Sequence, residues 1–446
     1  MTAAPIERPQ HPTEAVAPVG TRNRAWTVTV LLVVFMMVNF ADKSVLGLAA
    51  DEIRADLHLS ATQFGLVNGA FFLLFSVAAV LVGLAADRVS PKVLLLLMAL
   101  LWSVAQVPAA IGGGLAVLVA SRVFLGAAEG PAFPVAQQAT LAWFPNDRRN
   151  LPGALITLGV TLGVITSAPG LSWVIQHHGW RTALWVLAGV GLVWAAVWKA
   201  FGADGGHRVG TDRKPVREEE PAARVPYRAI LTSRTWIGAT FAYFTSYWTV
   251  ALMLVWLPSY LRNALGYTAG EAGTVVVAPW TIGAVVLLAQ AGVTGRLMRR
   301  GVGSRRARGW VGGTLLALGA LCCLAVPLAD GATAKTVLIA LGFGFGGSYA
   351  AVAATTVSEL APPNRAGGAL GVMNALVTMA GLAAPAVVGA LVDAQGTGGY
   401  QNAVVLSGLL LVLGAAASFW LIDPARDAAR PTADTSPTGP TQGARP

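Results

Sequence analysis

Apolar runs of about 20 residues recur along the whole chain, and they constrain the fold more than any other feature. A run of this length is what an α-helix needs to cross a bilayer, whereas a membrane β-barrel shows shorter segments of alternating polarity. Charged residues make up only 12% of the chain, about half the fraction of an average soluble domain. We therefore predict an all-α membrane protein with twelve transmembrane helices in two six-helix halves. The predicted segments are 25–50, 60–86, 92–112, 115–141, 150–172, 179–201, 234–260, 270–297, 308–328, 334–358, 367–392 and 401–422.

Three polar stretches divide the chain. Residues 1–24 and 423–446 are rich in Pro and Thr and predict disordered tails. Residues 202–233 hold basic residues and an acidic run, and predict a linker between an N-terminal half (25–201) and a C-terminal half (234–422).

The positive charges indicate the orientation in the membrane. The net charge is +10, and Lys43 and Arg122 lie inside predicted segments. If the N-terminus is cytoplasmic, the outer loops hold only Arg54, Arg181, Arg262 and Lys335, and all other Lys and Arg residues are cytoplasmic. The positive-inside rule therefore predicts a cell-membrane protein with both termini and the linker in the cytoplasm. Topology explains the basic pI, so we expect no nucleic-acid partner.

Two pairs of charged residues lie within apolar runs: Asp42 with Lys43, and Arg122 with Glu129. Arg122 and Glu129 are seven residues apart, so both side chains point to one face of a helix, about 10 Å apart. Ionisable groups at this depth are costly and commonly face a bundle interior or a water-filled path. A structural ion pair or a snorkelling arginine is the alternative interpretation.

The loop after the second segment contains Gly83, Asp87, Arg88 and Lys92 in the order G-x-x-x-D-R-x-x-x-K. This resembles the signature G-x-x-x-D-R-x-G-R-K of the major facilitator superfamily, which implies that Gly83, Asp87 and Arg88 belong to a cytoplasmic gate. Solvated loop charges are the alternative. In the corresponding loop of the second half, Gly295 replaces the aspartate.

A narrower resemblance covers most of the chain and points to the anion:cation symporter family. It rests on Asn39–Lys43 in the first segment, Arg122–Pro134 and Trp143–Pro145 in the fourth, Gly179–Arg181 in the sixth and Trp256–Leu261 in the seventh. The family's common first motif is N-Y-x-D-R; here Phe40 replaces Tyr, and Lys43 replaces Arg. Lys43 keeps the positive charge, but unlike arginine it cannot donate two parallel hydrogen bonds from a planar guanidinium to one carboxylate.

This resemblance implies proton-coupled symport of a small organic anion by alternating access. We expect Lys43 and Arg122 to bind the substrate carboxylate by charge-assisted hydrogen bonds, and Asp42 and Glu129 to take up and release protons. Depth along the helices places Asp42, Lys43 and Arg122 at one level and Glu129 about 10 Å deeper. The coupling ion is expected to be H⁺, with no other cofactor, and one chain is expected to suffice as a monomer.

In the second half, Tyr243 and Tyr247 share a helix face, and the resemblance implies that Asn374 contacts substrate. Aromatic residues in membrane helices otherwise serve packing or the interface. The tenth segment is apolar or small around 350–354. A carboxylate with an aromatic or short aliphatic body therefore fits better than a sugar acid.

A proton-coupled drug or metabolite antiporter of the same superfamily is the alternative function. Such antiporters often carry G-x-x-x-G-P on the fifth helix, whereas Gly163 is followed here by Val164. An enzyme is not expected, because no histidine pairs with Cys or acidic residues at metal-ligand spacing. Glycine pairs at small-xxx-small spacing (Gly159 with Gly163, Gly342 with Gly346, and Gly367 with Gly371) predict close helix contacts.

Overall fold

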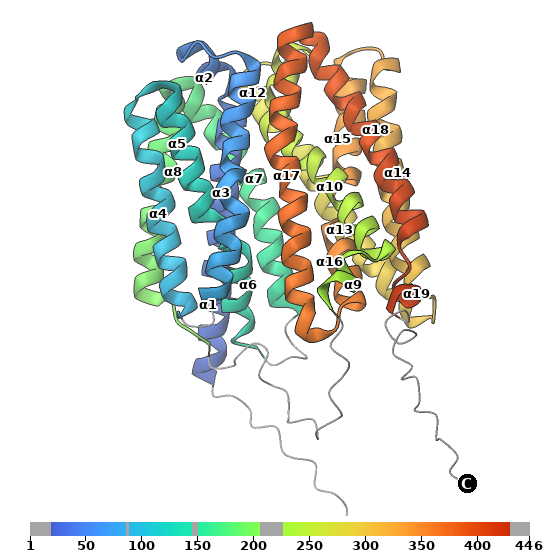
Figure 1. The fold of residues 1–446 in the computed structure, drawn as a ribbon. Helices are drawn as coiled ribbons and strands as arrows, with labels where there is room; N and C mark the ends of the chain where they lie inside the picture. The colour runs from blue at the N-terminus through green and yellow to red at the C-terminus, as the bar shows by residue number, and fades with distance from the viewer. Residues whose placement is uncertain (1–18, 86–88, 145–149, 206–225, 429–446) are drawn as a thin grey trace, which may run out of the picture.

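The computed structural model is a bundle of long, roughly parallel and antiparallel helices (Figure 1). It describes residues 19–85, 89–144, 150–205 and 226–428, and within these ranges it contains helices and no strand. Twelve helices or helix pairs in the described residues are long and apolar enough to cross a membrane. Their positions agree with the twelve predicted segments to within a few residues at most ends, so the predicted fold class is confirmed.

The first six transmembrane segments and one short helix between the first two of them comprise eight helices. These are α1 (Val19–Leu48), α2 (Ala50–Asp56), α3 (Ala61–Ala85), α4 (Pro91–Ile111), α5 (Gly114–Glu129), α6 (Ala132–Leu141), α7 (Asn150–His178) and α8 (Trp180–Phe201). The short α2 lies between the first and second segments, and the fourth segment is divided into α5 and α6.

The remaining helices form the last six segments, and three short helices lie outside these segments. These are α9 (Tyr227–Leu231), α10 (Arg234–Val255), α11 (Leu257–Asn263), α12 (Ala269–Val275), α13 (Val277–Arg299), η2 (Arg305–Trp310), α14 (Val311–Ala325), η3 (Val326–Leu328), α15 (Ala332–Gly346), α16 (Ala350–Leu360), α17 (Pro363–Gln395), α18 (Thr397–Leu421) and α19 (Pro424–Ala428). The two halves repeat each other: α11 follows the seventh segment as α2 follows the first, and the tenth segment is divided into α15 and α16 as the fourth is.

Three stretches that the sequence predicts to be polar tails or linker contain helix. The first helix already begins at Val19, α9 lies within 202–233, and α19 lies within 423–446. Tertiary contacts explain α19, because the carboxylate of Asp427 accepts a hydrogen bond from the backbone N–H of Thr235 at the start of α10 (2.8 Å). The other residues of these stretches, 1–18, 206–225 and 429–446, lie outside the described residues.

The start of α1, α9 and α19 lie at one end of the bundle, here called the terminal end, and α2 and α12 lie at the opposite end (Figure 1). Polar contacts tie the two halves together at the opposite end. Asp51 accepts hydrogen bonds from Ser259 (3.1 Å) and Asn263 (3.0 Å), and Arg262 forms an ion pair with Glu52 (2.8 Å). The carboxylate of Asp393 on α17 accepts the first two backbone N–H groups of α3, both at 2.8 Å.

Glycines bring α3 and α17 into backbone contact across the two halves at this end. A Cβ atom added at Gly69 would lie 2.5 Å from the carbonyl oxygen of Leu382, and one added at Gly65 would overlap the carbonyl of Pro385. Because a glycine carries no side chain, the two backbones can touch there. Between described residues, the hydrogen bonds and ion pairs that join the halves lie at the opposite end or in the middle, where Ser76 meets Thr378 at 2.6 Å.

Candidate binding site

The site begins with Lys43, which lies on α1 about one and a half turns before that helix ends. Its ammonium donates a hydrogen bond to Oδ1 of Asn39, one turn earlier (2.6 Å). The same nitrogen lies 3.4 Å from Oε2 of Glu129 at the end of α5, which is an ion pair without a tight hydrogen bond. The Lys43 side chain is 10% exposed and that of Glu129 is fully buried. Lys43 therefore neutralises a carboxylate contributed by another helix.

Three aromatic rings surround the Lys43 ammonium. The ring centroids of Phe40, Phe75 and Phe71 lie 4.4, 5.4 and 5.7 Å from the nitrogen. At these distances the ring faces attract a cation, and they also exclude water from it. The aromatic rings and Glu129 together hold the ammonium deep inside the N-terminal half.

A second charged pair lies beside the first, and it has a different geometry. Arg122 on α5 points its guanidinium at the backbone carbonyl of Asp42, with a 3.5 Å contact from Nη1. One carboxylate oxygen of Asp42 accepts a hydrogen bond from Gln106 on α4 (3.2 Å). The other carboxylate oxygen and Nε of Arg122 have no hydrogen-bond partner, although both residues are buried. Arg122 thus retains donors that can bind another anion.

The close approach of α5 to α3 explains why these groups meet. Gly126 lies on α5, and Gly130 directly follows this helix. A Cβ atom at Gly126 would overlap the backbone carbonyl of Phe71 on α3, and one at Gly130 would overlap that of Phe75. Pro131 then lacks a backbone N–H, and the segment breaks between α5 and α6 directly after Glu129. The sequence G-x-x-x-G-P therefore places Glu129 against the aromatic rings that surround Lys43.

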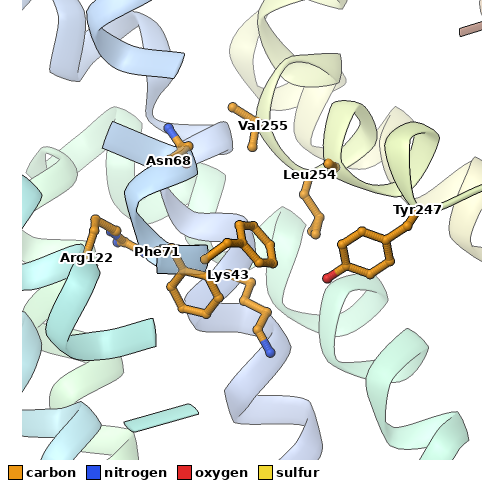
Figure 2. Close-up of a pocket in the computed structure, with 9 residues that line it drawn as sticks. Lys43, Asn68, Phe71, Arg122, Tyr247, Leu254 and Val255 are labelled. Atoms are coloured by element: carbon orange, nitrogen blue, oxygen red, sulfur yellow. The ribbon is translucent and has the colours of Figure 1, made fainter. Parts of the chain in front are cut away.

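A narrow cavity opens beside this cluster, between the two halves (Figure 2). The volume of this cavity is about 30 Å³. The N-terminal half contributes Lys43, Asn68, Phe71, Phe72 and Arg122, and α10 of the C-terminal half contributes Tyr247, Ala251, Leu254 and Val255. In Figure 2 the hydroxyl of Tyr247 points toward the side of the cavity where Lys43 lies.

Among the predicted substrate contacts, Lys43, Arg122 and Tyr247 line this cavity. Tyr243 does not line it, but its ring packs edge-to-face on that of Tyr247 with 6.3 Å between centroids. Asn374 on α17 is half-buried and is not among the lining residues. The structure therefore brings the charged groups together with one of the two tyrosines, and it leaves Asn374 apart from them.

The contacts of the charged side chains differ in part from the expected depths. Asp42, Lys43 and Arg122 lie together, as predicted, but the Lys43 side chain reaches the deeper Glu129. Of the predicted gate residues, only Gly83 belongs to the described residues. The backbone of Gly83 lies in α3, whereas Asp87 and Arg88 lie outside the described residues.

The sequence analysis assigned no role to several groups at the site. Gln106 and Asn68 are buried amides in apolar segments, and that polarity was a usable signal. The aromatic cage of Phe71 and Phe75 carried no such signal, because phenylalanine is common in membrane helices.

Comparison with known proteins gives a consistent picture. A family model described as the Major Facilitator Superfamily matches residues 32–385. A hexuronate transporter of Bacillus subtilis is 27% identical over 402 residues, covering 89% of this chain and 94% of the relative. A probable sulfoacetate transporter of Cupriavidus necator is 30% identical over 399 residues, covering 86% and 90%. A bacterial homolog of the human lysosomal transporter Spinster has the same fold, with a TM-score of 0.74, 17% identity and coverage of 91% and 98%.

Proposed function

Because the chain belongs to the Major Facilitator Superfamily, we propose that this multi-pass membrane protein takes up a small organic anion by proton-coupled symport with alternating access. One observation carries the proposal: the ion pair between Lys43 and Glu129, with Arg122 nearby, at the edge of a cavity between the two halves. Secondary transporters bind their cargo near the bilayer midplane, where their two repeats meet.

The anionic cargo follows from the charges. Lys43 and Arg122 both line the cavity, whereas the carboxylates of Asp42 and Glu129 are almost fully buried behind them. A ligand entering the cavity therefore meets two cations first. The two transporters compared above are named for hexuronate and sulfoacetate, which are both organic anions. This supports the same class of cargo here.

The ion pair supplies a mechanism for coupling. When a substrate carboxylate takes Lys43 as its partner, Glu129 loses the cation that neutralises it. An unpaired buried carboxylate is costly, so protonation of Glu129 restores neutrality. When the anion leaves, Lys43 returns to Glu129 and the proton departs. Anion and proton therefore bind and leave together, which is the requirement for symport.

The contacts between the halves support alternating access. The polar contacts of Asp51 and Arg262 and the backbone contact of α3 with α17 join the halves at the opposite end. We propose that these contacts separate in the other conformation, and that the terminal end, which carries most of the Lys and Arg residues that the structure describes, faces the cytoplasm.

Uptake into proteoliposomes tests the coupling. The full chain is reconstituted and offered radiolabelled organic acids with and without an inward proton gradient, beside protein-free liposomes. We expect gradient-driven accumulation by the wild type and by Glu271→Gln, a matched control because Glu271 caps α12 outside the site. Glu129→Gln should lose accumulation yet keep anion exchange, because exchange requires no release of the proton. Arg122→Ala should lose both.

Two results would count against the proposal. If gradient-driven uptake persists in both Glu129→Gln and Arg122→Ala, these charges have only a structural role. Absence of acid uptake together with expulsion of a cationic dye would favour the alternative antiporter.

A further inference from the structure

The wall of the cavity is mostly apolar, and this restricts the body of the cargo. Five of the nine lining residues have aromatic or aliphatic side chains without polar atoms: Phe71, Phe72, Ala251, Leu254 and Val255. They come from α3 on one side and α10 on the other, so apolar surface faces the cavity from both halves.

The polar lining groups are few, and two of them already have partners. Lys43 is bonded to Asn39 and paired with Glu129. The amide of Asn68 donates to the backbone carbonyl of Phe64 in its own helix (3.0 Å). Among the described residues, Nε of Arg122 has no hydrogen-bond partner, and the hydroxyl of Tyr247 points toward the side of the cavity where Lys43 lies (Figure 2). The site therefore offers one cationic pole, one phenol and the carbonyl oxygen of one amide.

A cavity with these few polar groups and an apolar wall suits one class of organic acid. A sugar acid buries several hydroxyl groups, and together they need more hydrogen-bond partners than this wall supplies. We propose that the cargo is a compact monocarboxylate with an aromatic or short aliphatic body, and that Phe72, Tyr247 and Leu254 determine this specificity. The inference rests on the proposed function and narrows its substrate class.

Phe72 and Tyr247 together form an aromatic wall of the cavity to which both halves contribute. Their rings lie edge-to-face, with centroids 6.1 Å apart and an interplanar angle of 88°. Phe72 is held from behind by α17, where a Cβ atom at Gly381 would lie 2.6 Å from the ring. With the carboxylate at Arg122 and Lys43, an aromatic body extends toward these two rings. The narrowness of the cavity also favours a compact molecule.

Binding is a cleaner test than uptake, because a protonated aromatic acid crosses bilayers unaided. Isothermal titration calorimetry on the purified full chain compares benzoate with D-gluconate, which carries the same charge. We expect benzoate to bind at least ~10-fold more tightly, since apolar groups fill an apolar pocket and hydroxyls there stay unpaired. Leu254→Asn, which keeps the size of the side chain and adds an amide, should reduce the ratio, and so should Phe72→Ser. Tyr267→Phe removes a phenol hydroxyl that bonds Thr336 elsewhere and should leave the ratio unchanged.

The outcomes separate the two proposals. Equal or tighter binding of D-gluconate to the wild type would overturn the substrate class and leave anion symport standing. An unchanged ratio in Leu254→Asn and Phe72→Ser, with both variants monodisperse and with wild-type melting temperatures, would overturn the assignment of the specificity residues. If proteoliposomes accumulate no organic acid and neither ligand binds, the proposed function fails together with the inference.

Discussion

Replacing Gly69 with alanine tests whether the contact between α3 and α17 controls which end of the bundle is closed. A Cβ atom there would lie 2.5 Å from the carbonyl oxygen of Leu382. Carbon-to-oxygen contacts are ordinarily about 3.3–3.6 Å, so the two helices must separate by roughly 1 Å. Such overpacking costs about 1–3 kcal/mol, and only the conformation closed at the opposite end bears this cost.

The expected result is a shift of population toward the conformation that is open at the opposite end. A difference of about 1–3 kcal/mol changes the ratio of the two conformations by roughly 5- to 150-fold. Alanine also has a higher helix propensity than glycine by about 1 kcal/mol, but this gain applies to both conformations and leaves their ratio unchanged.

Cysteine alkylation measures this shift. Val255 lines the cavity, and a cysteine at this position reports access from the opposite end. The native Cys322 and Cys323 are first replaced, because both are free thiols. With an impermeant maleimide, Gly69→Ala should raise the alkylation rate severalfold or more. The matched control is Gly371→Ala on α17, where an added Cβ atom would meet nothing within 4 Å. Equal rates in wild type and Gly69→Ala would refute the reasoning.

Three further predictions concern charged residues. Lys43→Gln should lower the free energy of unfolding by about 3–5 kcal/mol, because Glu129 is left buried without its cation, and adding Glu129→Gln should recover part of that loss in thermal melts. Asp393→Asn should weaken closure at the opposite end by about 1 kcal/mol, since the charge at the start of α3 is lost, and should raise alkylation at the same reporter cysteine. Burial by itself would raise the pKa of Asp427, but hydrogen bonds from Arg426 and from the backbone at the start of α10 lower it below the usual value. A depressed carboxylate pKa stabilises the folded state above the unfolded value of about 3.9, and this contribution is lost as pH falls through the folded value. The protection factors of the α19 amides, which correct exchange rates for the intrinsic pH dependence of exchange, should therefore fall on acidification below about pH 4, and less so in Asp427→Asn.

Much of the fold was predictable because a bilayer imposes simple requirements. Each segment must be about 20 residues long and apolar, and this signal is local in the sequence. The break of the fourth segment into α5 and α6 was not predicted, although Gly130 and Pro131 stand at it. Charged residues within an apolar segment can also be recognised from the local sequence. Two of those recognised in this way, Lys43 and Arg122, line the cavity.

Glycine spacing predicted helix contacts less well. Gly159 and Gly163 pack against Val33 and Met37 of α1, and Gly342 packs against Cys323, as expected. For Gly367 and Gly371 the prediction was wrong, because an added Cβ atom would meet nothing within 4 Å at either residue. Spacing shows that a helix face is flat, but the neighbour that covers the face is set by the packing of the whole bundle.

By itself, the sequence determined that this chain crosses a membrane twelve times and which segments carry buried charge, because hydropathy and charge are properties of single segments. The tertiary structure decided which charges pair. The sequence places Arg122 and Glu129 on one helix face, yet Glu129 pairs with Lys43 and Arg122 faces the carbonyl of Asp42. The physical reason is the crossing of α1, α3 and α5, where glycines let the backbones touch and so bring groups together that are far apart in the sequence.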